Sequence, residues 1–341
     1  MIGAVRNPGT RDGLTRVQAE RELQRLVQTA TARPAPTMVT VAEAGNRRLE
    51  QLEALGRKPS TMQDYRIMLD RHLAPHFASK ALDRVTAEDV TGYMAIKRRE
   101  GLAPKTITNH VTFLHGVFAH AVKRGWIAVN PVAGVDRPRS GADVDIRYLD
   151  LGQVDGLLRA VPDDTLGPVE GVLYLTAAMT GLRQGEVLAL RWRDVDWTAG
   201  VVRVRRSYTR GEFGTPKSRR SSRAVPMADR LAGELDRHYQ RSAYQADDDL
   251  VFCHPQTGHV LDPSKLLRRF KAALGKAGVR EVRFHDLRHT FGTHCAGAGV
   301  PLRTLQEWLG HRDFQTTLIY ADYLPSGQEA QLVEQASPRR S

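Results

Sequence analysis

An extended, proline-containing segment divides the chain into two regions with different residue patterns. It runs from Asn130-Pro131 to Arg137-Pro138-Arg139-Ser140-Gly141, and a residue that precedes proline is disfavoured in a helix. Such a run favours an extended connection over a packed element. At 341 residues the chain is also longer than one typical domain. We therefore predict two domains, one on each side of a linker.

Apolar residues recur at helical spacing before this linker. Ser60 followed by Gln63 resembles a capping box at the start of one helix. Pro104 fits the first turn of another helix, and Gly125 supplies its C-terminal stop. The apolar positions between these two residues are Ile107, Val111, Leu114, Phe118 and Ala121. The pattern predicts a small helical bundle.

The region after the linker predicts helices together with a short sheet. Val202 and Val204 alternate with Arg203 and Arg205, which is the period of two that is typical of a strand. A returning strand is expected at 224–226. The fold class is therefore mainly α with a small antiparallel β-sheet, a helical domain being followed by an α+β domain. The expected boundaries are an N-terminal extension or linker at 1–36, the helical domain at 37–130, the interdomain linker at 131–148, the α+β domain at 149–325 and a C-terminal tail at 326–341.

The charge balance favours a polyanionic partner. The chain has 50 Lys and Arg against 38 Asp and Glu, a formal net charge of +12 and a pI near 10.0. Such an excess concentrates nucleic acid at a protein surface. The residues expected to contact phosphates along a duplex are Lys97, Arg98, Lys105, Lys123, Arg205 and Arg219. The alternative is that these residues only form a solvated, charged face of the protein.

Cysteine usage and hydropathy indicate a soluble cytoplasmic protein. Cys253 and Cys295 are far apart in the sequence and lack metal-ligand spacing, so we predict neither a disulfide framework nor a zinc site. No apolar run reaches the length of a membrane helix or has the character of a signal peptide.

Side chains suited to phosphate chemistry gather near the C-terminus. His285 and Arg288 lie three residues apart, His311 follows Leu309-Gly310, and Tyr320 comes shortly after. A guanidinium binds two phosphate oxygens, an imidazole donates or moves a proton, and a phenol can form a covalent phosphodiester. These residues indicate an enzyme that cuts and rejoins nucleic acid.

Two residues earlier in the chain would complete this set. Arg183 follows a Gly-Leu turn, and Glu186 three residues later could orient it. Lys217 lies in a basic stretch beside Pro216, where it could protonate a departing 5′ oxygen. The structural alternatives are a surface salt bridge for Arg183 and a phosphate-clamping hairpin for Lys217.

Two further readings stay open at this point. His289 follows His285 by four residues, the spacing of paired metal ligands on a helix, but the general base of a zinc protease motif is absent. We therefore expect no metal. Tyr320 and Tyr323 both follow His311, and either could be a packing aromatic. A phenol is mostly protonated at neutral pH, so its attack needs a base or a cationic pocket. We take His285 as the candidate base and the arginines as the source of the positive electrostatic field.

These motifs resemble those of the tyrosine recombinase family, the phage-type integrases. Residues 180–187 resemble the first arginine block of that family, and residues 285–290 resemble the second. Leu309-Gly310-His311 with Tyr320 resembles the third, and the likeness runs over roughly residues 37 to 325. Pro216-Lys217 matches the hairpin lysine of the family more loosely.

The resemblance implies a helical core DNA-binding domain and a catalytic domain that close around DNA. Tyr320 would form a 3′-phosphotyrosyl link, while Arg183, Arg288 and His311 would stabilise the pentavalent phosphate. Lys217 would act as general acid, His285 would assist proton transfer, and no metal, ATP or other cofactor would be needed. The implied partners are double-stranded DNA recombination sites, three further copies of the chain in a synaptic homo-tetramer, and accessory directionality or DNA-bending proteins.

Two alternatives to this function remain. A DNA-binding accessory protein could keep the fold without strand exchange, and a DNA-relaxing topoisomerase uses related chemistry. Integration, excision and resolution are all compatible with the sequence.

Overall fold

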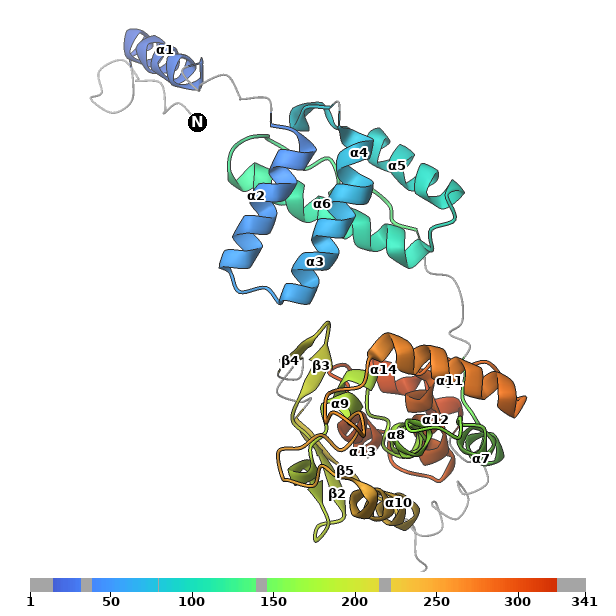
Figure 1. The fold of residues 1–341 in the computed structure, drawn as a ribbon. Helices are drawn as coiled ribbons and strands as arrows, with labels where there is room; N and C mark the ends of the chain where they lie inside the picture. Colours follow the sequence, from blue (N-terminus) through green and yellow to red (C-terminus); the bar gives the residue numbers. More distant parts are fainter. Residues whose placement is uncertain (1–14, 32–38, 79, 139–145, 215–221, 324–341) are drawn as a thin grey trace, which may run out of the picture. The chain divides into compact units, whose positions relative to one another are not determined.

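The computed structural model of this protein describes residues 15–31, 39–78, 80–138, 146–214 and 222–323. The chain divides into two compact units, Met1–Ala142 and Asp143–Ser341 (Figure 1). Helices dominate both units and a small antiparallel sheet lies in the second, which confirms the predicted fold class. Within the described ranges, no helix has the length and apolar character that crossing a membrane requires.

The first unit is helical. Its helices are α1 (Arg16–Thr31), α2 (Val41–Ala54), α3 (Pro59–Met68), α4 (Ala74–Phe77), α5 (Ala87–Arg99) and α6 (Pro104–Lys123). A π-helical turn at Leu69–Leu73 joins α3 to α4. Thr40 with Glu43 caps α2, and Thr86 with Asp89 caps α5, each through a reciprocal pair of hydrogen bonds.

The capping box expected at Ser60 is not formed. The N-cap residue of α3 is Lys58, whose side chain makes no capping hydrogen bond, and Pro59 occupies the first helical position. The fixed φ of proline favours the first turn of a helix, and its missing N–H removes one of the donors that a cap would satisfy. Pro59 thus starts α3 one residue before Ser60.

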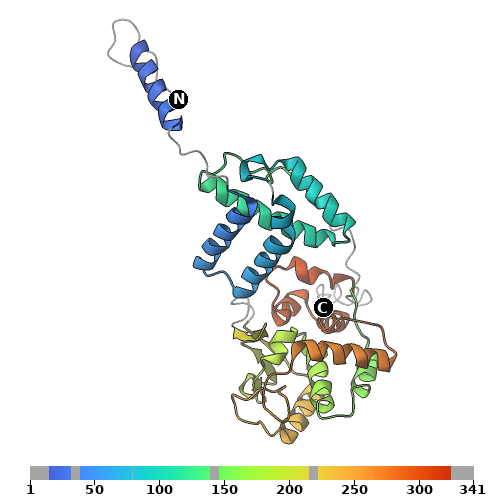
Figure 2. The same ribbon diagram turned by 45° about the horizontal axis from the view of Figure 1, so that its top comes forward.

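The core of the first unit forms along α6. Ile107, Val111, Leu114 and Phe118 are fully buried, and α6 packs against α2 and α5 (Figure 2). The helix starts at Pro104 and ends before Gly125, whose φ of 71° is unfavourable for other residues. Both ends of this helix agree with the prediction from the sequence.

The second unit is built around one buried helix, α8 (Gly167–Thr180). Its helices are α7 (Leu151–Arg159), α8 (Gly167–Thr180), α9 (Gln184–Leu188), α10 (Asp229–Arg241), α11 (Pro263–Ala277), α12 (Asp286–Gly297), α13 (Leu302–Leu309) and α14 (Gln315–Leu318). Helix α8 is apolar on nearly all sides and contacts α7, α10 and α12, which surround it in Figure 1. A helix that is hydrophobic all round belongs in a core.

Short antiparallel strands complete the second unit. They are β1 (Val195–Asp196), β2 (Val201–Val204), β3 (Ser207–Thr209), β4 (Glu212–Gly214) and β5 (Arg223–Pro226). The order in the three-stranded sheet is β1-β2-β5, with Val202 opposite Val225. Strands β3 and β4 form a separate hairpin. The sheet matters for function because β5 brings Arg223 to the end of α13.

Candidate active site

The turn between α8 and α9 positions Arg183. Gly181 ends α8 with a φ of 64°, and a Cβ atom there would lie 2.7 Å from the Phe291 ring and 2.8 Å from Leu309. Only glycine therefore fits. Arg183 then caps α9 in an extended conformation, and 37% of its side chain remains exposed.

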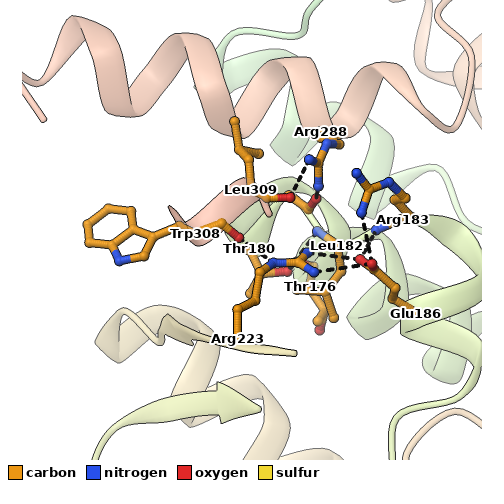
Figure 3. Close-up of polar contacts among 10 residues, drawn as sticks. Thr176, Thr180, Leu182, Arg183, Glu186, Arg223, Arg288, Trp308 and Leu309 are labelled. Carbon is orange, nitrogen blue, oxygen red and sulfur yellow. Dashed lines mark hydrogen bonds and ion pairs between the residues drawn. The ribbon is translucent and has the colours of Figure 1, made fainter. Parts of the chain in front are cut away.

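Glu186 holds Arg183 from inside the protein. Its Oε1 atom accepts a hydrogen bond of 2.9 Å from Arg183 Nη1, and its Oε2 atom accepts one of 2.9 Å from the Arg183 backbone N–H. The carboxylate also binds Arg223, so two guanidiniums approach it from different sides (Figure 3). Burial raises the pKa of Glu186, but the hydrogen bonds and charges of Arg223 and Arg183 outweigh it and lower the pKa to about 2. Glu186 is ionised at neutral pH.

Arg288 is the most buried of the site arginines. It lies on α12 with 2% of its surface exposed, and Nη1 donates to the carbonyl of Gly181 over 2.7 Å. Nη2 donates to the carbonyl of Leu309. Burial, followed by the charges of Arg183 and Arg223, lowers the pKa of Arg288 to about 9, so it is still cationic at pH 7.

His311 is held just beyond α13. Gly310 ends that helix with a φ of 64°, and His311 is 8% exposed, with Nδ1 2.9 Å from the Thr317 hydroxyl. Burial and the charges of Arg288 and Arg183 lower the pKa of His311 to about 3. The imidazole is therefore neutral at pH 7. When Thr317 donates to Nδ1, the proton resides on Nε2, which can donate to a ligand.

Tyr320 lies in the same site but is completely buried. Its exposed fraction is 0%, and its ring packs on Gly292, where a Cβ atom would come within 3.0 Å of the ring carbons. Burial raises the pKa of Tyr320 to about 12, although the charge of Arg288 partly opposes this. The phenol is protonated and shielded from solvent in this conformation.

The imidazole that forms a hydrogen bond with the Tyr320 hydroxyl is that of His289. Its Nδ1 lies 2.9 Å from the Tyr320 oxygen, and burial lowers the pKa of His289. From the sequence, His285 is the candidate base and His289 has no catalytic role; the available signal for His289 was its position four residues after His285. His285 caps α12, its ring centroid lies 5.5 Å from that of His289, and desolvation together with the charge of Arg288 lowers its pKa.

The remaining candidates fall into two groups. Lys217 and Arg219 lie outside the described residues, in the stretch 215–221 between β4 and β5. Tyr323 follows Tyr320, and its ring lies edge-on to Tyr148 with 5.5 Å between centroids. It is half-buried and packs against the hydrophobic core that includes Tyr320.

The predicted DNA contacts are exposed in all described cases except one. Arg98, Lys105, Lys123 and Arg205 are exposed, and Arg205 lies 3.7 Å from buried Asp194. Lys97 is only 9% exposed, so its expected surface position is wrong.

The burial of Lys97 has a local cause. Its ammonium nitrogen lies 5.6 Å from the centroid of the buried Tyr93 ring and pairs with Glu100 over 2.9 Å. Long cationic side chains often cover apolar surface in this way. Lys97 therefore acts in packing.

No described group of three or more His, Cys, Asp or Glu side chains could hold a metal ion. The described site instead consists of cationic and neutral donors around a buried tyrosine. A convergence of guanidiniums defines a site for an oxyanion, and a phosphodiester is the oxyanion on which a tyrosine can act.

Comparisons with known proteins agree with this chemistry. A model of the Phage integrase family matches residues 147–326, and a model of the Phage integrase SAM-like domain matches residues 42–137. The chain belongs to the phage integrase family of tyrosine recombinases, which are enzymes that cleave and rejoin DNA.

Individual relatives match over most of their length. A tyrosine recombinase XerC-like protein of Caldanaerobacter subterraneus subsp. tengcongensis is 28% identical over 87% of this chain and 82% of its own. The Tn1549 transposon integrase in complex with a circular intermediate DNA has a similar fold, with a TM-score of 0.69, 21% identity and coverage of 88% of this chain and 100% of that one. A lambda integrase tetramer bound to a Holliday junction has a TM-score of 0.64 at 18% identity, over 90% of this chain and 92% of that one.

Proposed function

We propose that this recombinase cleaves DNA through attack of Tyr320 on a backbone phosphate. A bond forms between the phenolic oxygen and phosphorus, and the bond from phosphorus to the 5′ oxygen breaks. The products are a 3′-phosphotyrosyl link and a free 5′ hydroxyl. A 5′ hydroxyl from a partner strand reverses the step, so the phosphodiester energy is conserved without ATP. The observation that carries this proposal is that Arg288 of α12 bonds to the carbonyl of Gly181, two residues before Arg183, and to that of Leu309, two residues before His311, while the Tyr320 ring packs against Gly292 of the same helix.

The site residues divide the chemical tasks among them. Arg183 and Arg288 would neutralise the non-bridging oxygens, and His311 would donate from Nε2, because charge that develops in the transition state is best met by donors already in place. Glu186 orients Arg183. Lys217 would protonate the 5′ oxygen, and His285 would assist transfer of the proton from the phenol.

The buried position of Tyr320 implies a resting state. Its hydroxyl bonds to His289 and its ring is enclosed against Gly292, so a phosphate cannot reach the oxygen. We infer that DNA binding is accompanied by release of the segment around Tyr320. The segment from the short helix α14 to the 3₁₀ turn at Ala321–Tyr323 is weakly anchored, since only Thr317 and Tyr320 are buried between residues 315 and 323.

The substrate we propose is a pair of double-stranded recombination sites brought together by four copies of the chain. The DNA in the Tn1549 integrase complex and the tetramer of lambda integrase on a Holliday junction support this proposal. Accessory directionality or DNA-bending proteins are proposed as further partners. We place the reaction in the cytoplasm, and the free state of Cys253 and Cys295 is compatible with a reducing compartment.

The alternatives are less favoured. A non-catalytic accessory protein has no need for a buried cationic site next to a tyrosine, and burial of Arg288 without function is costly. A topoisomerase of related chemistry would relax a supercoiled plasmid that lacks any specific site, whereas the proposed recombinase would not.

A suicide DNA substrate tests the proposal. A nick near the cleavage position lets the short fragment with the free 5′ hydroxyl diffuse away. The covalent complex therefore accumulates, and denaturing electrophoresis separates it from the free protein. Wild type and Tyr323→Phe should form the adduct, whereas Tyr320→Phe should form none while binding DNA normally. An adduct that persists in Tyr320→Phe and disappears in Tyr323→Phe would overturn the assignment.

A further inference from the structure

Arg223 is a buried arginine that the proposed chemistry leaves without a role. It is the first residue of β5, and 5% of its side chain is exposed. The same side chain makes three described hydrogen bonds to two distant segments, Glu186 in α9 and Trp308 in α13 (Figure 3). A charged group with so little exposure is retained only when its partners are well placed.

The first of these contacts is a bidentate ion pair. Nη1 of Arg223 lies 3.1 Å from Oε1 of Glu186, and Nη2 lies 2.9 Å from Oε2. Arg183 binds the same carboxylate through one guanidinium nitrogen and its backbone N–H. Glu186 thus pairs with two guanidiniums. The buried guanidinium of Arg223 binds it through two nitrogens, and the more exposed guanidinium of Arg183 binds it through one.

This sharing affects how Arg183 can bind a phosphate. If Arg223 were absent, Glu186 would be a buried carboxylate whose described cationic partner is Arg183 alone. The attraction between them would then draw the Arg183 guanidinium inward, away from a ligand. With Arg223 in place, most donors of Arg183 remain available, which agrees with its 37% exposed side chain.

The second contact fixes the end of α13. Nε of Arg223 donates to the carbonyl of Trp308 over 2.5 Å, beside the Leu309 carbonyl that Arg288 binds. The Cδ atom of Arg223 also lies 3.0 Å from where a Cβ atom of Gly310 would stand. Two arginines therefore satisfy carbonyls at the end of this helix, immediately before His311.

We propose that Arg223 is a positioning residue of the cleavage site: it neutralises Glu186 so that Arg183 stays available to the phosphate, and it holds the helix end that carries His311. This inference rests on the proposed function. Lysine cannot replace it, because a single ammonium cannot grip both carboxylate oxygens and reach the Trp308 carbonyl in the geometry of the guanidinium.

The test is a double-mutant cycle on the rate of adduct formation with the suicide substrate. Arg223→Ala should slow cleavage by at least about tenfold, because it misplaces one phosphate donor. Adding Glu186→Gln removes the charge that captures Arg183, so the double variant should cleave at least about threefold faster than Arg223→Ala alone. DNA affinity should change by less than about threefold in both variants, because most contacts to the DNA backbone lie elsewhere.

A matched control and a second substitution keep the outcomes distinct. Arg237→Ala removes an exposed arginine of α10 that pairs with Glu234, and it should cleave at the wild-type rate. Arg223→Lys, with and without Glu186→Gln, gives the same comparison if the alanine variant does not fold. An Arg223 variant that folds and cleaves like Arg237→Ala, or a double variant no faster than Arg223→Ala, would overturn the inference. A wild type that forms no adduct would instead overturn the proposed function.

Discussion

The hydroxyl oxygen of Tyr320 lies 2.9 Å from Nδ1 of His289, and the tyrosine ring is completely buried. A nucleophile in this position is protected from solvent and from any ligand. Under the proposed function, the proposed phosphate-binding groups are assembled in this structure while the proposed nucleophile is withheld. Cleavage would then require a rearrangement of the segment that carries Tyr320.

The withheld position predicts the chemical reactivity of Tyr320. In protein without DNA, nitration at neutral pH should modify the half-buried Tyr208 much faster than Tyr320, which is 0% exposed. Peptide mass spectrometry measures both. Addition of DNA carrying a cleavage site should raise the nitration of Tyr320 relative to Tyr208. Equal modification of the two tyrosines in the free protein would contradict a buried resting state.

Removal of each of the two arginines proposed to bind phosphate, Arg183 and Arg288, should have different effects on stability. Arg183→Ala and Arg288→Ala should each slow cleavage by at least about 10²-fold, as expected for loss of a donor to developing charge. Arg288→Ala should also lower the thermal stability, because it leaves the Gly181 and Leu309 carbonyls without their donor. Single-turnover kinetics and thermal unfolding measure the two effects. A decrease below tenfold for both variants would exclude transition-state roles.

His311 should make the protein sensitive to acid. Its pKa is lowered from 6.5 to about 3 in the folded protein, so below pH 6.5 the unfolded chain takes up a proton that the folded protein does not. The free energy of unfolding should therefore fall as the pH decreases from 6.5 towards 3. In His311→Gln this contribution is absent, and the fall between pH 7 and 5 should be smaller. Urea titrations across this range measure it, and equal pH dependence in the two proteins would be the contrary result.

Two adjacent basic residues of α5 should have separable effects. Lys97 pairs with Glu100 and covers the Tyr93 ring, so Lys97→Ala should lower the melting temperature with little change in DNA affinity. Exposed Arg98 is expected to contact phosphate, so Arg98→Ala should weaken binding and reduce the salt dependence by about one counterion. Mobility shifts at several salt concentrations measure this. If Lys97→Ala weakened DNA binding and Arg98→Ala only lowered the melting temperature, the choice of Arg98 as the DNA-binding residue would be wrong.

The features that could be predicted from the sequence are those fixed by local chemistry. Thr86 with Asp89, Pro104, and Gly310 each determine a helix end through the backbone within a few residues. The order and spacing of Arg183, Arg288 and His311 likewise predicted a common site, because few other reactions need this combination, and their catalytic roles stay a prediction.

Features that depend on distant segments could not be predicted in the same way. The partners of Arg223 are 37 and 85 residues away in the sequence, so it could be recognised only as one member of a basic stretch. His289 was assigned no role because the choice between two imidazoles depends on where the Tyr320 hydroxyl lies. Lys97 was expected on the surface because a run of charged residues does not indicate which of its side chains packs on an aromatic ring.

The proposed function depends most on the formation of a covalent bond between the oxygen of Tyr320 and DNA. The most direct measurement is to trap the complex of wild-type protein with a suicide substrate, digest both components, and locate the nucleotide-bearing residue by peptide mass spectrometry. We expect a nucleotide on Tyr320 of the peptide that contains both Tyr320 and Tyr323. A nucleotide on Tyr323, or on any residue outside this segment, would contradict it.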